Sequence, residues 1–300
     1  MDQRVDYVES VNRAMDYVLA HLADPLPLEA VAQAAGFSPF HFHRVFKGLM
    51  GETLNEFVRR LRLERALSLM SRAPTDSLTT IALQCGFASS SDFSRSFKQR
   101  YGVAPSRFEL TELKESRHAE LLDLMKQNGA RPNLDRIPPG ENPDGFTVAM
   151  RSLPPRTMAY LRVLDPYHGG VIEAYRDLMT WAEERGVADR DWYGYMWDDP
   201  QVVALEDCRY DVAVDVGDLP LKEFGELVGR YEFPAMRVGE LKMKGDIALE
   251  MRALDWIFRT WLPESGLAPD DQPGFEAWDG RPFEHGTEHF EIGLHLPVRS

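Results

Sequence analysis

The strongest constraint on this chain is a pattern near its N-terminus that occurs twice. Four residues recur at an offset of 50: Leu28, Ala32, Gly36 and Phe37 match Leu78, Ala82, Gly86 and Phe87. Six more recur at an offset of 51: Phe42, Arg44, Phe46, Lys47, Gly51 and Phe57 match Phe93, Arg95, Phe97, Lys98, Gly102 and Phe108. Each copy is typical of a short helix, a turn containing glycine and a second helix. The repeat predicts two helix-turn-helix units, joined by an amphipathic helix over residues 54–70.

The second helix of each unit carries the residues expected to read DNA. Such a helix enters the major groove with one face, which presents residues at spacings of i, i+3 and i+4. Arg44 and Arg95 occupy equivalent positions, and an arginine can pair with guanine O6 and N7 through two hydrogen bonds. Phe40 is suited to contact a thymine methyl group. The predicted DNA-binding set is Phe40, His43, Arg44, Lys47, Ser90, Ser91, Ser94, Arg95 and Lys98.

Several basic side chains are expected to hold the DNA backbone rather than to read bases. Contacts to phosphates fix the position of a protein on DNA without specifying its sequence. We expect this role for Lys47, Lys98, Arg59, Arg60 and Arg62.

The aromatic residues of the repeat are expected to form its core, namely Phe42, Phe46, Phe93 and Phe97. Cys85 stands where the first copy has Ala35, which indicates a small buried position. The chain has two cysteines, too few for a disulfide framework or a four-thiolate metal site.

Histidines near the C-terminus resemble a metal-ligand spacing but are expected to lie in a loop. His285 and His289 flank Glu288, and Gly286 argues against a helix at this point. We therefore expect no metal site and no cofactor.

The negative charge of the chain is unevenly distributed. The formal net charge is −14, yet residues 1–118 carry 15 lysines and arginines against 14 aspartates and glutamates. The first part is thus near neutral and can carry a basic face, whereas the acidic remainder would attract a cation or serve only solubility. No apolar run approaches the roughly 20 residues of a membrane helix, and the N-terminus lacks an apolar signal core. We expect a cytoplasmic protein.

Length and composition divide the chain into two domains and a linker. Three hundred residues exceed what one core usually serves. The run ARPNLDRIPPGENPDG is rich in proline, glycine and asparagine, which is typical of a linker. We expect a DNA-binding domain over residues 1–112, a linker over 113–143 and a second domain over 144–300.

The second domain is expected to mix helices and strands. Strand-like runs occur at residues 202–205, 210–216, 226–232 and 290–298, and helical patterns occur near 170–185 and 247–262. Trp181 and Gly186 recur as Trp261 and Gly266, at an offset of 80. This second, weaker repeat predicts an α+β domain of two similar halves with a cleft between them.

The N-terminal motif resembles a known family. The stretch IALQCGFASSSDFSRSFKQRYGVAPSRF, from Ile81 to Phe108, is similar to the signature of AraC/XylS-type transcription regulators of bacteria. The resemblance covers roughly residues 5–112. It implies two units entering successive major grooves on one DNA face, with readers at Phe40, His43, Arg44, Ser90, Ser91, Ser94 and Arg95. Glu109 departs from the pattern, since the family usually has arginine there, and a phosphate contact is weakened.

The C-terminal part resembles a second family. WDDP at 197–200, WLPESG at 261–266 and GFEAW at 274–278 are similar to GyrI-like effector-binding domains, over about residues 145–300. The resemblance implies a small ligand, often cationic and aromatic, in a cleft between two similar halves. It places a pocket carboxylate on Glu276. A carboxylate among aromatic rings suits a lipophilic cation, and the candidate aromatic walls are Tyr193, Tyr195, Trp197 and Trp278.

These features predict a multidomain fold, in which an all-α duplicated helix-turn-helix domain precedes an α+β pseudo-duplicated effector-binding domain. The leading hypothesis is a sequence-specific DNA-binding transcription regulator, not an enzyme, whose C-terminal domain senses a small molecule. Its expected partners are double-stranded DNA and the effector, with RNA polymerase as a further candidate and no membrane.

Two other hypotheses stay open at this stage. Glu276 with a nearby tyrosine could act as an acid–base pair, in a protein that hydrolyses small molecules and carries an attached DNA-binding domain. Alternatively, the chain could bind gyrase or polymerase as a protein-interaction module. Only the regulator hypothesis explains the duplicated helix-turn-helix.

Overall fold

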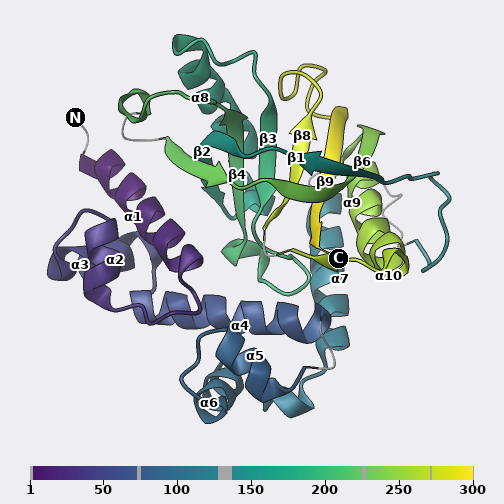
Figure 1. Cartoon of the computed structure of the whole chain (residues 1–300). Helices are drawn as coiled ribbons and strands as arrows, with labels where there is room; N and C mark the ends of the chain where they lie inside the picture. Colours follow the sequence, from purple (N-terminus) through teal and green to yellow (C-terminus); the bar gives the residue numbers. More distant parts are fainter. Residues whose placement is uncertain (1–2, 73–75, 128–136, 225–227, 271, 300) are drawn as a thin grey trace. The chain divides into compact units, whose positions relative to one another are not determined.

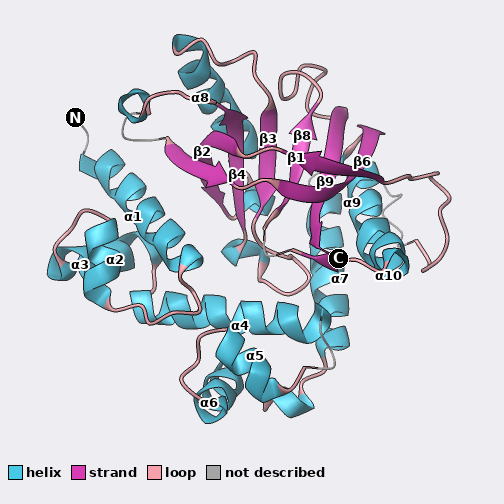
Figure 2. Cartoon of the chain, in the orientation of Figure 1, coloured by secondary structure: helices cyan, strands magenta, loops and turns pink. Residues whose placement is uncertain are grey.

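Helices alone form the first of two units, residues 1–116, and an antiparallel sheet with helices forms the second, residues 117–300 (Figures 1 and 2). The computed structural model describes residues 3–72, 76–127, 137–224, 228–270 and 272–299. Both fold classes agree with the sequence prediction. Within these described ranges, no helix is long and apolar enough to cross a membrane.

The first unit contains the two predicted helix-turn-helix pairs, α2–α3 and α5–α6. Its helices are α1 (Gln3–Ala20), α2 (Leu28–Ala34), α3 (Pro39–Met50), α4 (Leu54–Arg72), α5 (Leu78–Gln84) and α6 (Ser90–Tyr101). A 3-10 turn, η1 (Pro105–Arg107), follows α6. The amphipathic helix expected over residues 54–70 is α4, and it joins the two pairs.

The segment expected as a linker is partly helical. Helix α7 (Leu110–Gln127) covers its first half and crosses the boundary between the two units. The segment is helical because leucine, glutamate and lysine, which favour helices, dominate its sequence. Residues 128–136 lie outside the described part of the chain. Ile137 is buried in a core cluster of the second unit, so the second unit extends into the predicted linker.

Left-handed backbone explains why glycine recurs in both turns. Gly36 and Gly86 have φ of +77° and +83°, and the C-caps Gly51 and Gly102 have φ of +73° and +81°. For a residue with a β-carbon, this conformation costs roughly 1–2 kcal/mol. Ser38 stands at the N-cap of α3 but makes no side-chain cap bond.

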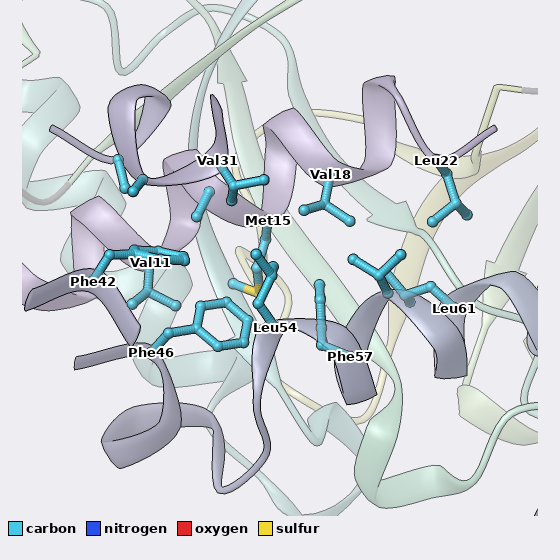
Figure 3. Packing of buried hydrophobic residues seen from close by; sticks show 14 residues of the cluster. Val11, Met15, Val18, Leu22, Val31, Phe42, Phe46, Leu54, Phe57 and Leu61 are labelled. Atoms are coloured by element: carbon cyan, nitrogen blue, oxygen red, sulfur yellow. The ribbon is translucent and has the colours of Figure 1, made fainter. Parts of the chain in front are cut away.

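Aromatic side chains build the core of each pair, as predicted, and Figure 3 shows the core of the first. Phe42 and Phe46 are fully buried, and Phe46 meets Phe57 edge-on with ring centroids 5.4 Å apart. Phe93 and Phe97 are buried in the same way in the second pair. Each buried phenylalanine contributes about 1.5–3 kcal/mol.

Cys85 fills the small buried position predicted for it. It is fully buried, and burial raises the pKa of its thiol to about 12. The thiol therefore stays neutral at physiological pH and serves packing.

The end of α1 anchors the second helix pair. Arg62 on α4 donates hydrogen bonds to the carbonyl oxygens of Leu22 at 2.9 Å and Asp24 at 2.7 Å. A β-carbon placed on Gly86 would lie 2.7 Å from the Leu22 oxygen and 2.8 Å from that of Ala23. The turn of the second pair thus packs directly on the backbone that follows α1.

In the part of the second unit that the structure describes, nine strands form the sheet. They are β1 (Ala149–Leu153), β2 (Arg156–Leu164), β3 (Trp192–Met196), β4 (Arg209–Asp215), β5 (Gly229–Phe233), β6 (Met236–Gly245), β7 (Ala268–Pro269), β8 (Gly274–Trp278) and β9 (Phe290–Arg299). The sheet order is β1-β6-β9-β8-β3-β4-β2-β5, with every pair antiparallel and β7 beside β9.

The predicted duplication of this unit is visible in its topology. The offset of 80 that relates the two tryptophans also relates the first residue of β1 to that of β5, and the first residue of β2 to that of β6. Strand β1 pairs with β6 and β5 pairs with β2, so each half places its first strand at the edge of the other half. At the centre, Tyr195 of β3 pairs with Phe275 of β8, and the same offset makes these two residues counterparts. The pseudo-two-fold axis therefore passes through this pair.

Helices cover one face of the sheet, which we call the helix face. Helix α8 (Val171–Glu184) packs on β2 and β4, whereas α9 (Ile247–Trp256) packs on β6. A π turn (Ile257–Trp261) and α10 (Leu262–Ser265) continue α9. The opposite face, which we call the aromatic face, holds a separate core cluster that includes Tyr193, Tyr195 and Phe275.

The predicted elements of this unit are confirmed except for one. The helices near 170–185 and 247–262 and the strands at 210–216 and 290–298 are present, and β5 overlaps the strand predicted at 226–232. The strand predicted over residues 202–205 is wrong. There the backbone turns, because the amides of Val202 and Val203 both donate to the Asp199 carbonyl, and a 3-10 turn, η3 (Leu205–Asp207), follows. These valines are buried without being in a strand.

We expect Gly86→Ala to destabilise the first unit more than Gly36→Ala. In both variants the left-handed backbone conformation lowers the free energy of unfolding by roughly 1–2 kcal/mol. Gly36 has only an ordinary contact at 3.6 Å, whereas the Gly86 methyl would overlap backbone atoms and cost about 1–3 kcal/mol more. Urea unfolding followed by far-UV circular dichroism measures the difference. All six tryptophans lie in residues 181–278, so their fluorescence monitors the second unit separately. Equal losses in the two variants would contradict the packing argument.

Candidate functional site

The outward face of α3 carries the predicted reading residues together. Phe42 and Phe46 point into the core, so Phe40, His43 and Arg44 lie on the opposite face and are exposed, as is Lys47 one turn further. Phe40 is 77% exposed. A single exposed ring does not by itself mark an interface, so the DNA contact of Phe40 stays a prediction.

The second reading helix, α6, has an equivalent but more polar face. Ser91, Arg95 and Lys98 are exposed, whereas Ser90 and Ser94 are half-buried. The Arg95 side chain is 80% exposed, and its acidic neighbour Asp92 lies 3.9 Å away. An exposed pair at this distance is worth little, so the guanidinium can leave it for a base.

Two of the predicted phosphate contacts are wrong. Arg60 is 9% exposed and bound to Glu52 at 2.6 Å and to Glu64 at 3.3 Å. Arg62 donates hydrogen bonds to the backbone carbonyl groups of Leu22 and Asp24, which follow α1. Both arginines therefore stabilise the fold, whereas Arg59, Lys47 and Lys98 remain exposed.

The predicted ligand-binding residues of the second unit fall on two faces of the sheet. Glu276 and Trp278 point to the helix face, while Phe275 next to Glu276 points to the aromatic face. Since side chains alternate along a strand, Tyr193 and Tyr195 of β3 lie with Phe275. The five predicted residues therefore do not share one face of the sheet. Their closeness in sequence could not show this, because the face of each residue depends on the register between β3 and β8.

The aromatic face is a packed core rather than a wall around Glu276. The rings of Tyr195 and Phe275 lie 5.3 Å apart. The guanidinium of Arg156 lies 5.0 Å from the Tyr193 ring and 4.8 Å from the Phe275 ring. Trp197 donates from Nε1 to Asp211 at 2.6 Å. Tyr193 and Tyr195 are thus buried on this face, whereas Trp197 is half-buried and lines a small hollow there together with Tyr195.

On the helix face, Glu276 lies in a pair of buried carboxyl groups. It is 8% exposed, and its acidic neighbour Glu250 of α9 is 6% exposed. Tyr210 of β4 donates its hydroxyl to Glu276 Oε2 at 2.8 Å. Burial raises the pKa of Glu250 well above its ordinary value, and the Glu276 charge adds to the rise. Burial also raises the pKa of Glu276, although its hydrogen bonds to Tyr210 and Glu250 oppose this.

Three aromatic side chains, Tyr175, Trp278 and Phe283, pack together beside this carboxyl pair, and we call them the aromatic box. Tyr175 of α8 donates to the Tyr193 carbonyl at 2.9 Å and accepts from Trp278 Nε1 at 2.8 Å. Phe283, from the loop after β8, packs on both rings with centroids 5.5 Å from Tyr175 and 4.7 Å from Trp278. Phe283 has φ of +58°, a strained conformation for a bulky residue that is typical of functional sites.

Gly194 makes this arrangement possible. It lies directly opposite Glu276 across the β3–β8 pair. A β-carbon at Gly194 would lie 1.6 Å from the hydroxyl oxygen of Tyr210 and 3.0 Å from that of Tyr175. Because Gly194 has no side chain, the Tyr210 hydroxyl has room to reach the carboxyl group of Glu276.

The structure adds Glu250, Tyr210, Tyr175 and Phe283 to the site, none of which the sequence analysis named. Two of them carry a signal in the sequence. Glu250 shares a helical face with the buried residues Ala253 and Ile257, so a charge faces the core there. Tyr210, Val212 and Val214 are spaced by two residues along β4 and therefore share one face of the sheet. This places the Tyr210 hydroxyl on the helix face.

The exposed histidines of the β8–β9 loop stand apart from this site. His285 and His289 lie 4.0 and 3.9 Å from Glu291. Within the described ranges, no three His, Cys, Asp or Glu side chains are grouped so as to hold a metal ion.

Comparison with known families agrees with this architecture, a helix-turn-helix unit followed by a ligand-binding unit. The model of the GyrI-like small molecule binding domain matches residues 146–299, and a helix-turn-helix domain model matches residues 31–110. The chain belongs to the GyrI-like family, and its N-terminal domain is of the AraC type, so both predicted resemblances are confirmed.

Curated relatives such as the following two match about a third of the chain. The regulatory protein PocR of Salmonella typhimurium is 34% identical over 108 residues, which is 36% of this chain and 35% of PocR. The right origin-binding protein of Escherichia coli K12 is 33% identical over 107 residues, 35% of this chain and 36% of that protein. The chain thus spans about a third of the length of these two relatives.

Solved structures show the same partial likeness. An AraC-type regulator of Chromobacterium violaceum has 28% identity and a TM-score of 0.31, covering 32% of this chain and 86% of that one. The DNA-binding domain of AdpA, solved in complex with a target DNA, has 25% identity and a TM-score of 0.31, covering 32% and 86%.

We expect Gly194→Ala to destabilise the second unit by about 1–3 kcal/mol, the cost of overpacking a closed site. Gly274→Ala is the matched control, because Gly274 is the counterpart of Gly194 in the internal repeat and its added β-carbon would have only ordinary contacts at 3.7 Å. Urea unfolding followed by tryptophan fluorescence compares the two variants. If both lose the same stability, Tyr210 does not occupy the space at Gly194.

Proposed function

We propose that this protein is a transcription regulator that binds specific DNA through its first unit and senses a small cationic, aromatic molecule through its second. The duplicated reading helices carry the first half of this proposal. The second half is carried by the buried carboxyl pair beside an aromatic box, in a domain of the small-molecule-binding family.

The geometry of the first unit suits two major grooves on one side of DNA. Helix α4, which separates the two helix-turn-helix pairs, has 19 residues and a length of about 28 Å at 1.5 Å per residue. Successive major grooves on one face of DNA lie roughly 34 Å apart. The two reading helices can therefore engage a single asymmetric site without a second copy of the chain.

The roles of the exposed residues follow from their chemistry. Arg44 and Arg95 are the base readers, and Phe40 contacts a thymine methyl group. His43, Ser90, Ser91 and Ser94 add weaker polar contacts. Lys47 and Lys98 hold phosphates, which contributes affinity without sequence preference.

The ligand site comprises Glu276 and Trp278 together with Glu250, Tyr210 and Tyr175. The charge of the carboxyl pair attracts a cation, and the faces of the aromatic rings add cation–π attraction. Tyr193, Tyr195 and Trp197 lie on the other face of the sheet and are left out. Because the pair is buried, the ligand enters as the strained Phe283 loop moves aside.

Ligand binding changes DNA affinity by a coupling free energy of about 1–3 kcal/mol. The protein works in the bacterial cytoplasm and binds its effector without turning it over. A contact with RNA polymerase stays a prediction.

We expect the double variant Arg44→Ala, Arg95→Ala to lose sequence preference. Each bidentate contact to guanine is worth about 1–3 kcal/mol of discrimination, so the ratio of specific to nonspecific affinity should fall at least tenfold. Fluorescence anisotropy at two salt concentrations measures this, on DNA from the gene's own upstream region and on scrambled DNA.

The charge-matched control is Lys47→Ala, Lys98→Ala. It also removes two positive charges, but it should weaken binding to both DNAs alike and reduce the salt slope by about one per lysine. The assignment of base readers is wrong if the arginine and lysine variants behave identically.

We expect phenyltrimethylammonium, a permanently charged aromatic cation, to bind the second unit, and Glu276→Gln to weaken it at least tenfold. Its uncharged isostere tert-butylbenzene should bind more weakly to the wild type and be insensitive to the substitution. Calorimetry measures both affinities, and mass spectrometry of the recovered probe checks that it is unchanged. Equal binding of the two compounds would contradict a cation site.

A further inference from the structure

Arg156 of β2 is a buried cation on the aromatic face of the sheet. It is 8% exposed, and its guanidinium lies 4.8 Å from the centre of the Phe275 ring, 5.0 Å from that of Tyr193 and 6.0 Å from that of Phe233. In the part of the chain that the structure describes, no aspartate or glutamate forms an ion pair with it. Aromatic rings attract a cation but do not neutralise it. Arg156 therefore lacks the negative partner that a buried charge ordinarily has.

Two carboxylates of the same face, Asp211 and Glu240, already have partners. Asp211 accepts hydrogen bonds from Nε and Nη2 of Arg162, at 2.8 and 2.7 Å. Glu240 accepts from Nε of Arg151 at 2.9 Å. Each carboxylate is thus matched by an arginine of its own, and the charge of Arg156 is left over.

The hydroxyl of Tyr195 is a second buried polar group without a partner. Tyr195 is 2% exposed, and among the described residues neither its hydroxyl nor Nε of Arg156 has a hydrogen-bond partner. Nη2 of Arg156 donates to the Met236 sulfur at 3.6 Å, and a thioether is a weak acceptor. Buried donors without an acceptor are rare in folded proteins, so each one calls for an explanation, such as a bound ion.

The two groups have common neighbours. The rings of Phe233 and Phe275, which both lie beside the Arg156 guanidinium, are 4.5 and 5.3 Å from the Tyr195 ring. One acceptor with negative charge at this point would therefore satisfy both donors.

A hollow of about 180 Å³, counted with its open mouth, adjoins this point. Five aromatic side chains line it: Tyr160, Tyr195, Trp197, Tyr231 and Phe233. Met158 lines it as well, and Arg156 precedes Met158 on the same face of β2 and is the partner of Phe233 in the β2–β5 register. Trp197 and Tyr231 are half-buried. The hollow is narrow in the empty protein, so these two rings must part to admit a ligand.

We propose that this hollow binds a small aromatic carboxylate, which pairs with Arg156, accepts the hydroxyl hydrogen of Tyr195 and lays its ring among the aromatic side chains. A carboxylate and a guanidinium form a strong, charge-assisted pair, and a flat ring suits offset or edge-on packing against other rings. The site lies on the face of the sheet opposite Glu276. It gives the unit a second ligand, of opposite charge, and does not depend on the cation site.

The test is a fluorine NMR titration of 4-fluorobenzoate into the full chain at neutral pH, with 4-fluorobenzamide as its uncharged isostere. The carboxylate should bind about tenfold more tightly than the amide, since a hydrogen bond to a charged group is worth more than a neutral one. An excess of phenyltrimethylammonium should not displace it, because the two sites lie on different faces.

Two variants separate ligand binding from folding. Arg156→Met removes the charge and should weaken 4-fluorobenzoate about tenfold while leaving 4-fluorobenzamide unchanged. Tyr195→Phe removes the hydroxyl alone and should weaken the carboxylate severalfold. Because neither polar group has its partner in the empty protein, neither variant should lower the urea midpoint followed by tryptophan fluorescence.

The matched control is Lys242→Met. Lys242 is an exposed cation of the same face, on β6, so its loss removes the same charge without touching the hollow. Binding of 4-fluorobenzoate should stay within about twofold of the wild type, because exposed charges are screened by salt.

The opposite results overturn the proposal. Equal binding of the two probes, or equal losses in Arg156→Met and Lys242→Met, would mean that the ligand does not neutralise Arg156. Displacement by phenyltrimethylammonium would place both probes in one site. If 4-fluorobenzoate does not bind, or if Tyr195→Phe lowers the urea midpoint and leaves binding unchanged, the two groups serve the fold alone. None of these results decides the cation site, whose own test uses Glu276→Gln.

Discussion

The antiparallel pair of β3 and β8 is the constraint on which the second unit depends. Its register places Gly194 opposite Glu276 and Tyr195 opposite Phe275. Because side chains alternate, the first pair faces the helices and the second faces the aromatic core. The glycine leaves room for Tyr210, whose hydroxyl satisfies a carboxyl group that would otherwise be buried at a high cost. The centre of the sheet thereby combines a tightly packed face with a chemically polar one.

The two duplications of this chain serve different ends. In the helical unit, both copies keep an arginine at the equivalent position, Arg44 and Arg95, so the proposed base contact is repeated. In the sheet unit, the repeat makes Met196 the counterpart of Glu276 and Phe290 the counterpart of Tyr210. The scaffold is repeated but its polar groups are not. One carboxyl pair therefore lies beside the pseudo-axis, where helices from both halves contribute Tyr175 and Glu250.

The sequence predicts most of what depends on local periodicity and little of what depends on register. The helix pairs, their glycine turns and their phenylalanine cores follow from spacing alone. The motif singled out Glu276, which is buried in the structure, and its role in binding a ligand stays a prediction. That Tyr193, Tyr195 and Trp197 lie on the face opposite Glu276 could not be predicted, because the face of each residue of β3 is known only once its pairing with β8 is known. Arg60 and Arg62 were misassigned because a basic residue on a helix looks the same whether its partner is a phosphate, a glutamate or a carbonyl. Glu250 was missed because its partner lies on another element, far along the chain.

The carboxyl pair also connects ligand binding to the stability of the unit. The pKa of Glu250 is raised on folding, so between its ordinary value and the raised one the folded state holds a proton that the unfolded state has lost. Stability in that window falls as the pH rises, and the pair opposes folding at neutral pH in comparison with acid. A site designed only for packing would gain from an apolar residue here, since buried polar groups are costly. A cation that binds only the folded unit offsets this cost by mass action. Such a cost in the folded unit is one physical means by which a ligand shifts the free energy between two states of a sensor.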